Sequence, residues 1–119
     1  ASDLNSPKAE VLILEYKSKL QEPMLDELFE AILLLQDKED CYRFFEDLCS
    51  VGELKAMAQR WQVVKMLVEN RTYTDIVEET GASTATISRV KRCLHFGADG
   101  YQRIIKRLLN KDVSDNNKG

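Results

Sequence analysis

The sequence contains no apolar run long enough to cross a bilayer. The longest apolar runs are short, such as the run from Ala31 to Leu35, whereas a membrane-spanning helix needs about 20 residues. The first residues also lack the basic, apolar and small-residue order of a secretory signal peptide. We therefore expect no membrane partner and a cytoplasmic location.

Cysteine and histidine are also scarce, which argues against several kinds of chemistry. The three cysteines, Cys41, Cys49 and Cys93, are odd in number and show no CxxC spacing, so we expect reduced thiols and no metal site. The single histidine, His95, has no second acid–base group near it in sequence. Neither a glycine-rich phosphate loop nor a nucleophile motif is present. We therefore expect that the protein is not an enzyme.

Acidic side chains slightly outnumber basic ones in the chain as a whole, and the two kinds are unevenly distributed. The net charge is −3. Residues 1–59 contain 6 Lys/Arg and 13 Asp/Glu, whereas residues 60–111 contain 10 Lys/Arg and 5 Asp/Glu. Because nucleic-acid affinity depends on local cations that face phosphates, the basic half is compatible with DNA binding. The asymmetry is mild, and segregation of charge by chance would also produce it.

No stretch alternates with period two over the length of a strand, which predicts an all-α fold of six or seven helices. Caps, prolines and glycines set the expected ends. The expected helices run from Ser6-Pro7 through Val11 to Leu20, from Pro23 to Leu35, from Cys41 to Leu48, from Ser50 to Asn70, across residues 72–93, and from Ala98 to Leu109. The charged residues 37–40 are interpreted as a turn, and residues 111–119 as a disordered tail. Because the chain opens with Ala1 and not Met, part of an N-terminal extension at residues 1–20 is expected to be foreign to the natural protein.

Residues 72–93 are the most informative segment, because they predict two short helices joined by a tight turn. Thr72 with Asp75 three residues later predicts a capping-box-like helix start. Gly81 supplies a left-handed residue to end this helix, and Ser83 can cap the next one. The apolar residues that would close the two helices onto each other are Ile76, Val77, Ala82, Ile87 and Val90. The pattern predicts a helix-turn-helix, although an αα-corner in a helical core has the same pattern.

The outward face of the second helix carries small residues first and cations after them. It consists of Thr84, Ala85, Thr86, Ser88, Arg89 and Arg92. A helix that enters a major groove needs this order, because its N-terminal end meets base edges while longer cations reach phosphates. The side chains expected at DNA phosphates are Tyr73, Thr74, Ser88, Lys91 and Arg92. For Tyr73 and Thr74, an ordinary solvated surface is an equally good interpretation.

The expected helix from Pro23 to Leu35 is apolar over more than one stripe, since residues 31–35 are unbroken in apolar character. Such a helix is buried on several sides. In a chain this short, a second copy of the chain is the simplest cover. We therefore predict a homodimer. In it, the second helix of the helix-turn-helix in one copy lies one turn of DNA away from the same helix in the other copy.

The segments EDLCSVGELKAMAQRWQVVKML and GASTATISRVKR resemble the tryptophan repressor family, and LFEAILLLQDKEDCYRFFEDLC is similar to its YerC/YecD group. The resemblance covers roughly residues 20–110. It implies an all-α, intertwined dimer from bacteria, with residues 21–110 as the DNA-binding and dimerisation domain. It also implies a sequence-specific repressor of transcription that binds a double-stranded operator. The start of recognition helix 83–93 would contact bases through Thr84, Ala85 and Thr86.

The resemblance also bears on effectors. In the family's best-known member, tryptophan lies between two arginines, whose counterparts here are Arg60 and Arg89. The glycine that leaves room for the indole is replaced by Val90, and a serine three positions later by Cys93. Because a β-branched side chain would occupy indole volume, we expect no cofactor and no L-tryptophan binding. These four residues remain a candidate pocket for an unidentified effector, while the interpretation that we favour for the arginines is solvated or phosphate-facing cations.

Two interpretations from other functional classes stay open. The first is a helix-turn-helix module that binds a protein partner, which the modest positive charge and the lack of a strongly basic arm would suit. The second is a sensor of an anionic small molecule that uses Arg60 and Arg89.

Overall fold

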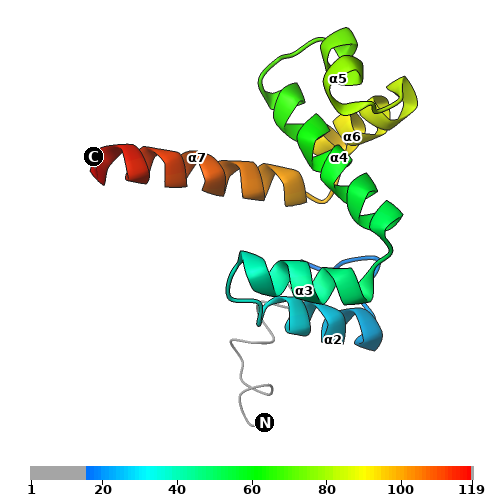
Figure 1. Cartoon of the computed structure of the whole chain (residues 1–119), viewed down its shortest axis with the longest axis vertical. Helices are drawn as coiled ribbons and strands as arrows, with labels where there is room; N and C mark the ends of the chain where they lie inside the picture. The colour runs from blue at the N-terminus through cyan, green and yellow to red at the C-terminus, as the bar shows by residue number, and fades with distance from the viewer. Residues whose placement is uncertain (1–15, 119) are drawn as a thin grey trace. The chain divides into compact units, whose positions relative to one another are not determined.

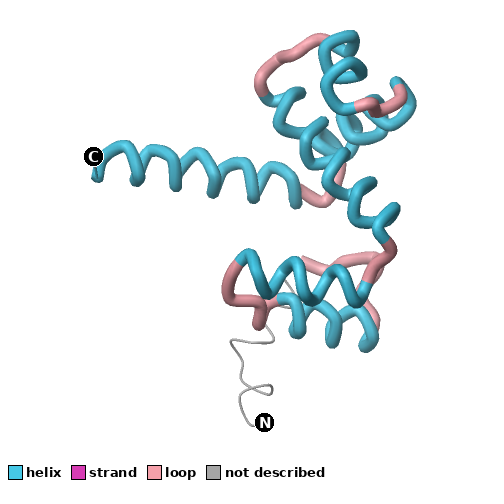
Figure 2. The backbone as a smooth tube through the Cα atoms, viewed as in Figure 1, coloured by secondary structure: helices cyan, strands magenta, loops and turns pink. Residues whose placement is uncertain are grey.

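The computed structural model describes residues 16–118, and this part of the chain contains six α-helices and no strand (Figures 1 and 2). The all-α prediction is confirmed. The helices are α2 (Pro23–Ile32), α3 (Lys38–Leu48), α4 (Val51–Val68), α5 (Tyr73–Thr80), α6 (Thr84–Phe96) and α7 (Gly100–Lys118). The chain divides into two compact units, Ala1–Phe44 and Phe45–Gly119. Within residues 16–118, no helix combines the length and the apolarity that a bilayer crossing requires.

Most of the helix predicted between Ser6 and Leu20 lies outside the described residues, and its predicted end is wrong. Residues 16–18 are irregular and residues 19–20 form a turn. The backbone N–H of Leu20 donates to Ser18 Oγ at 3.0 Å, and that of Gln21 donates to the Ser18 carbonyl at 3.4 Å. A serine that binds nearby backbone groups in this way competes with helix formation.

Helix α2 starts at Pro23, as predicted, because proline suits the first helical position. It ends at Ile32, earlier than the predicted Leu35. The N–H of Leu34 donates to the Ala31 carbonyl at 3.0 Å, and that of Leu35 donates to the Ile32 carbonyl at 3.1 Å. These short-range bonds tighten the chain beyond the α-helix into turns of 3₁₀ type.

Helix α3 begins at Lys38, earlier than the predicted Cys41. Asp37 Oδ1 accepts the backbone N–H of Asp40 at 2.8 Å, which is the bond of a helix N-cap. The interpretation of residues 37–40 as a turn is therefore wrong, since the acidic run caps and begins a helix. None of the residues in α2 or α3 is buried.

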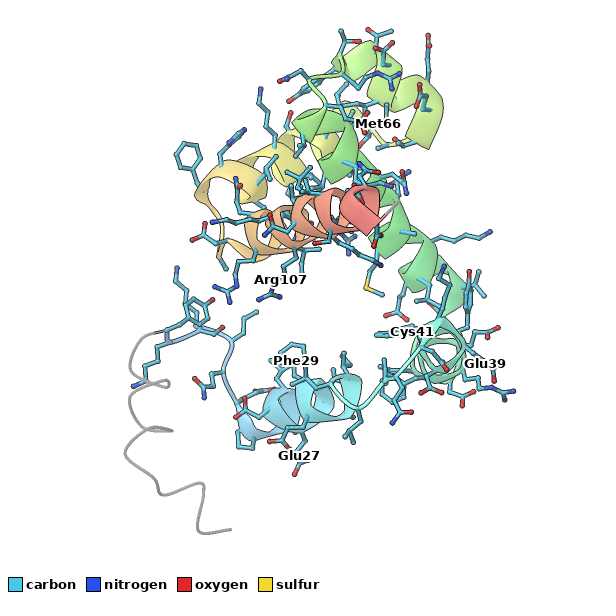
Figure 3. The ribbon with its side chains drawn as sticks, turned by 90° about the vertical axis from the view of Figure 1, so that its left-hand side faces the viewer. Glu27, Phe29, Glu39, Cys41, Met66 and Arg107 are labelled. Atoms are coloured by element: carbon cyan, nitrogen blue, oxygen red, sulfur yellow. The ribbon has the colours of Figure 1, made fainter. Side chains whose placement is uncertain are left out.

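The first unit leaves large apolar side chains open to solvent. Phe29, labelled in Figure 3, stands on α2 and is 54% exposed. The other large apolar side chains with high exposure at residues 16–44 are Tyr16, Leu20, Met24, Leu33, Leu34 and Tyr42. Met24, Phe29, Leu33 and Leu34 lie within the segment from Pro23 to Leu35, for which the sequence predicted a wide apolar surface.

The second unit holds the core, to which α4, α5 and α6 contribute. Its buried residues are Val63, Val64, Met66, Ile76, Ala82, Ile87, Val90 and Leu94. Helix α4 contacts both α5 and α6, these two contact each other, and α7 contacts α6. Trp61 and Tyr101 pack against this core as partly buried residues, with their ring centroids 6.5 Å apart.

Helix α4 begins with the capping box predicted at Ser50. Ser50 Oγ accepts the N–H of Glu53 at 3.1 Å, and Glu53 Oε1 accepts the N–H of Ser50 at 2.8 Å. The backbone N–H of Ser50 therefore lowers the pKa of the Glu53 carboxyl.

Helix α4 ends at Val68, slightly before the predicted Asn70. Asn70 has φ of 61° and is left-handed. Its N–H donates to the Leu67 carbonyl, and the N–H of Arg71 donates to the Met66 carbonyl, both at 3.0 Å. These two bonds form a Schellman motif in which asparagine takes the place usual for glycine.

Helix α7 differs most from the prediction. It begins at Gly100, after Asp99 at φ of 66°, and continues past the predicted end at Leu109 to Lys118. Residues 111–118, interpreted from sequence as a disordered tail, are therefore helical. The sequence between Gly100 and Gly119 contains neither glycine nor proline, so no residue there stops the helix.

Candidate nucleic-acid interface

Helices α5 and α6 form the predicted helix-turn-helix, and local caps determine their ends. Thr72 Oγ1 accepts the N–H of Asp75, and Ser83 Oγ accepts the N–H of Thr86, each at 3.1 Å. Gly81 lies between the helices at φ of 73°, the left-handed conformation in which glycine pays no Cβ penalty. Helix α6 extends to Phe96, past the predicted end at residue 93.

The inward face of the motif agrees with the sequence except at two positions. Of the five predicted contact residues, Ile76, Ala82, Ile87 and Val90 are at most 2% exposed, whereas Val77 is 37% exposed. Val77 follows Ile76 directly, and one helical step of about 100° turns it away from the core. Leu94, which is 5% exposed, was not predicted. Its spacing of seven from Ile87 was the available signal.

The outward face of α6 presents the side chains expected from the sequence. Exposed residues on it are Thr84, Ala85, Ser88, Arg89, Lys91 and Arg92. Thr86 is half-buried, and its hydroxyl lies 3.1 Å from Ser83 Oγ. The helix therefore carries small polar groups at its N-terminal end and cations further along.

The start of α5 meets the middle of α6. Tyr73 is half-buried and Thr74 is exposed. Lys91 Nζ lies over the Tyr73 ring, 5.9 Å from its centroid, within reach of a cation–π contact. Both residues line an open hollow together with Thr72 and His95. Two of the predicted phosphate contacts, Tyr73 and Lys91, are thus side by side.

Arg71 holds two acidic side chains of α5, a contact that sequence reasoning missed. Its Nε lies 3.4 Å from Asp75 Oδ2, and its Nη2 forms an ion pair with Glu79 Oε1. The hydrogen bond to Glu79 raises the pKa of Arg71. The Asp75 carboxylate pairs with Arg71. It therefore does not accept the backbone N–H of Thr72, which would complete the predicted capping box. The pairing offsets negative charge on α5, the helix that carries the predicted phosphate contacts Tyr73 and Thr74.

The turn of the motif is attached to α4 by Gln59. Its Nε2 donates to the Thr80 carbonyl at 3.0 Å. Thr80 Oγ1 in turn donates to the Ile76 carbonyl at 2.7 Å and accepts the N–H of Ala82 at 3.1 Å. Because a partly buried carbonyl needs a donor, the amide of Gln59 stabilises the turn that positions α6. The separation of 21 residues left no local signal of this bond.

The comparisons with known proteins agree on one family. The family model described as "Trp repressor protein" matches residues 23–109. The chain belongs to the Trp repressor family. Its relatives include YerC of Bacillus subtilis (strain 168), which is 51% identical over 84% of this chain and 96% of YerC. A "Trp operon repressor homolog" of Chlamydia trachomatis serovar L2 is 32% identical over 71% of this chain and 92% of that protein.

A solved structure of the Trp repressor family shares the fold. The TrpR-like protein from Eubacterium eligens ATCC 27750 superposes with a TM-score of 0.73 at 54% identity. The match covers 76% of this chain and 93% of that one. The resemblance predicted from the sequence is therefore confirmed, as is the all-α fold of this type.

The four residues of the candidate effector pocket are in different environments in this Trp repressor family member. Val90 is 2% exposed and belongs to the core, Arg60 is half-buried and Arg89 is exposed. Cys93 is an exposed free thiol. It lines an apolar hollow with Trp61, Gly97, Ala98, Gly100, Tyr101 and Ile104, a lining that includes none of the other three. The effector pocket stays a prediction.

Within residues 16–118, no group of three or more His, Cys, Asp or Glu side chains is arranged to hold a metal ion.

Proposed function

We propose that this member of the Trp repressor family is a sequence-specific DNA-binding regulator of transcription, a repressor, that acts as a homodimer with α6 in the major groove. The observation that carries the proposal is the two-faced character of α6. Ile87, Val90 and Leu94 attach one face to the core. The opposite face is open and presents small polar groups before cations, the order that groove reading requires.

The proposed contacts divide into two kinds. Thr84, Ala85 and Thr86 read base edges from the first turn of α6. Tyr73, Thr74, Ser88, Lys91 and Arg92 hold phosphates. Phosphate contacts position the protein on the duplex, and base contacts select the sequence. The N–H groups at the start of α5 add a favourable dipole for a phosphate beside Tyr73.

The proposal includes a second copy of the chain. Its support is the exposed apolar surface of α2 and the residues that follow it, where Leu33 is 82% and Leu34 77% exposed. Surfaces of this kind mark association sites. Sedimentation should give a dimer at micromolar concentration, and a dilute monomer would argue against this part of the proposal.

Selection of bound duplexes from a random pool tests the proposal as a whole. We expect enrichment of a sequence with two related half-sites, spaced by about 10 base pairs or a multiple of it. Binding without any sequence preference, or no binding at low salt, would contradict the proposed function. A helix-turn-helix module for protein partners would give that result.

Lys91→Gln is expected to weaken binding to all DNA sequences alike and to flatten its salt dependence. Each lost phosphate contact should reduce the slope of log K against log salt by about 0.9, or about 1.8 for a symmetric dimer. Fluorescence anisotropy at several salt concentrations measures this. Lys55→Gln makes the same charge change at an exposed position on α4 and serves as the control. Equal slopes for the two variants would remove Lys91 from the interface.

L-tryptophan is expected not to bind. We propose this because the family position that leaves room for the indole carries Val90, whose side chain is packed in the core. Isothermal titration should show no saturable heat, while a tryptophan-binding repressor measured in parallel gives the positive control. A micromolar dissociation constant for L-tryptophan would contradict this prediction. It would make tryptophan a candidate ligand for the predicted effector pocket.

A further inference from the structure

The open hollow where the start of α5 meets α6 contains one side chain that the proposed function has not used, His95. Thr72 and Tyr73 line the hollow from the start of α5, and Lys91 and His95 line it from α6. Lys91 and His95 are four residues apart, so they are neighbours on the same face of the helix. Because Tyr73 and Lys91 are predicted phosphate contacts, His95 shares the hollow with both of them.

The hollow is lined by basic groups, and no described side chain in its lining carries a carboxylate. Its titratable side chains are Arg71 from the connection between α4 and α5, Tyr73 from α5, and Lys91 and His95 from α6, whereas α7 adds an amide and an aliphatic side chain. The charge of Arg71 is balanced by its two acidic partners on α5. In the described part of the chain, neither Lys91 nor His95 forms an ion pair. The hollow therefore offers an anion two basic groups that no carboxylate neutralises.

Contacts on both sides hold this turn of α6 in place. Lys91 Nζ lies 5.9 Å from the centroid of the Tyr73 ring. On the other side, Gln102 Nε2 of α7 donates to the Leu94 carbonyl at 2.8 Å, which satisfies a carbonyl in the last turn of α6. His95 follows Leu94 directly and is exposed. Its backbone is thus supported while its imidazole remains open to a ligand.

We propose that this hollow binds a DNA phosphate through Lys91 and His95, and that protonation of His95 tightens DNA binding as the pH falls from 8 to 6. This inference rests on the proposed function. Histidine is the side chain whose ordinary change of charge falls between about pH 5 and pH 8, while a phosphodiester stays charged throughout. The protonated imidazole is a cation that donates from both ring nitrogens, whereas the neutral ring donates from one. DNA binding therefore takes up a proton at His95.

The affinity of the full chain for a selected duplex, measured by fluorescence anisotropy at pH 6 and pH 8 and at fixed salt, tests the proposal. The wild type should bind more tightly at pH 6, by roughly two- to fivefold for each protomer, as for an exposed ion pair. His95→Gln should lose this difference and match the wild type at pH 8. His95→Lys should bind with the wild-type pH 6 affinity at both values. Lys55→Gln, the charge control on α4, should keep the pH response.

His95 is the only histidine in the sequence, so selective ¹³C labelling of histidine in an untagged chain reports its charge directly. At pH 7 its imidazole C–H signals should move toward their protonated position when the duplex is added. A residue that only supports the fold would show no such proton uptake. Inorganic phosphate, at the concentration of phosphate groups in the duplex, should cause no such shift. An equal shift would mean that the hollow binds the free ion and not the DNA.

Several outcomes would overturn the inference while leaving DNA binding intact. Equal affinity of the wild type at pH 6 and pH 8 would remove His95 from the interface. A loss in His95→Gln that is the same at both pH values would make His95 a structural residue, and circular dichroism establishes whether that variant is folded. A pH response that persists in His95→Gln would belong to another group. If the wild type binds no duplex at low salt, the proposed function fails, and the inference fails with it.

Discussion

Ile87→Ala should lower the free energy of unfolding by about 2–5 kcal/mol, the cost typical of truncating a large buried aliphatic residue. The side chain of Ile87 is 0% exposed. It belongs to the core that α4, α5 and α6 share, so the truncation leaves a cavity between α6 and the helices that support it. Urea unfolding followed by circular dichroism measures the change.

If the proposed function holds, the same substitution should also weaken specific DNA binding, although Ile87 lies in the core and not on the outward face of α6 proposed to contact DNA. The small core of the motif holds α6 at a defined angle, and base readout tolerates little displacement of the helix. Binding measured at low temperature, where the variant remains folded, separates a displaced helix from an unfolded protein.

Ile104→Ala provides the matched control for Ile87→Ala. It removes the same atoms from α7, where the side chain is 44% exposed. Its cost should be well below that at Ile87, because much of the side chain is already in contact with water. Equal losses of stability at the two positions would contradict the location of the core.

Gly97→Ala should lower the free energy of unfolding by about 1–3 kcal/mol, as expected when extra atoms are forced against fixed neighbours. A Cβ added at Gly97 would lie 2.3 Å from the carbonyl oxygen of Cys93. That oxygen is backbone, and it already accepts the N–H of Gly97 at 2.9 Å in the last bond of α6. Relief of the overlap therefore requires movement of the helix end and of the connection to α7.

Gly52→Ala is the matched control for Gly97→Ala, since no atom lies within 4 Å of a Cβ added there. Gly52 is exposed in the first turn of α4. Alanine at this position should be neutral or stabilise by about 0.4–1 kcal/mol, because it restricts the unfolded chain. Thermal unfolding of the two variants compares them directly. A Gly97→Ala protein as stable as Gly52→Ala would show that the end of α6 relaxes without cost.

Helix starts were predictable where a cap acts on its own neighbours. Ser50, Thr72 and Ser83 each accept a backbone N–H three residues later. Because such a bond depends on residue type and spacing alone, the sequence shows it. Asp37 makes the same bond and was overlooked, since the surrounding charges were taken for a turn.

Helix ends were harder to predict because they depend on competing backbone bonds. Asn70 ends α4 in a Schellman motif. Glycine is the usual residue at this position, so asparagine indicates the helix end less clearly in the sequence. Leu34 and Leu35 look helical by composition but form tighter turns. The end of α7 was instead predicted too early. Residues 111–118 are polar and suggested a loose tail, but no helix-breaking residue interrupts them and the helix continues.

The sequence by itself determined the all-α class, the helix-turn-helix predicted at residues 72–93, and the order of side chains along the outward face of α6. These depend on periodicity, caps and turn residues, whose physics is confined to a few neighbouring positions. The tertiary structure alone decided that Gln59 supports the turn and that Arg71 pairs with the acids of α5. These contacts depend on which side chains the folded chain brings together and in what orientation, and local patterns carry little of that information.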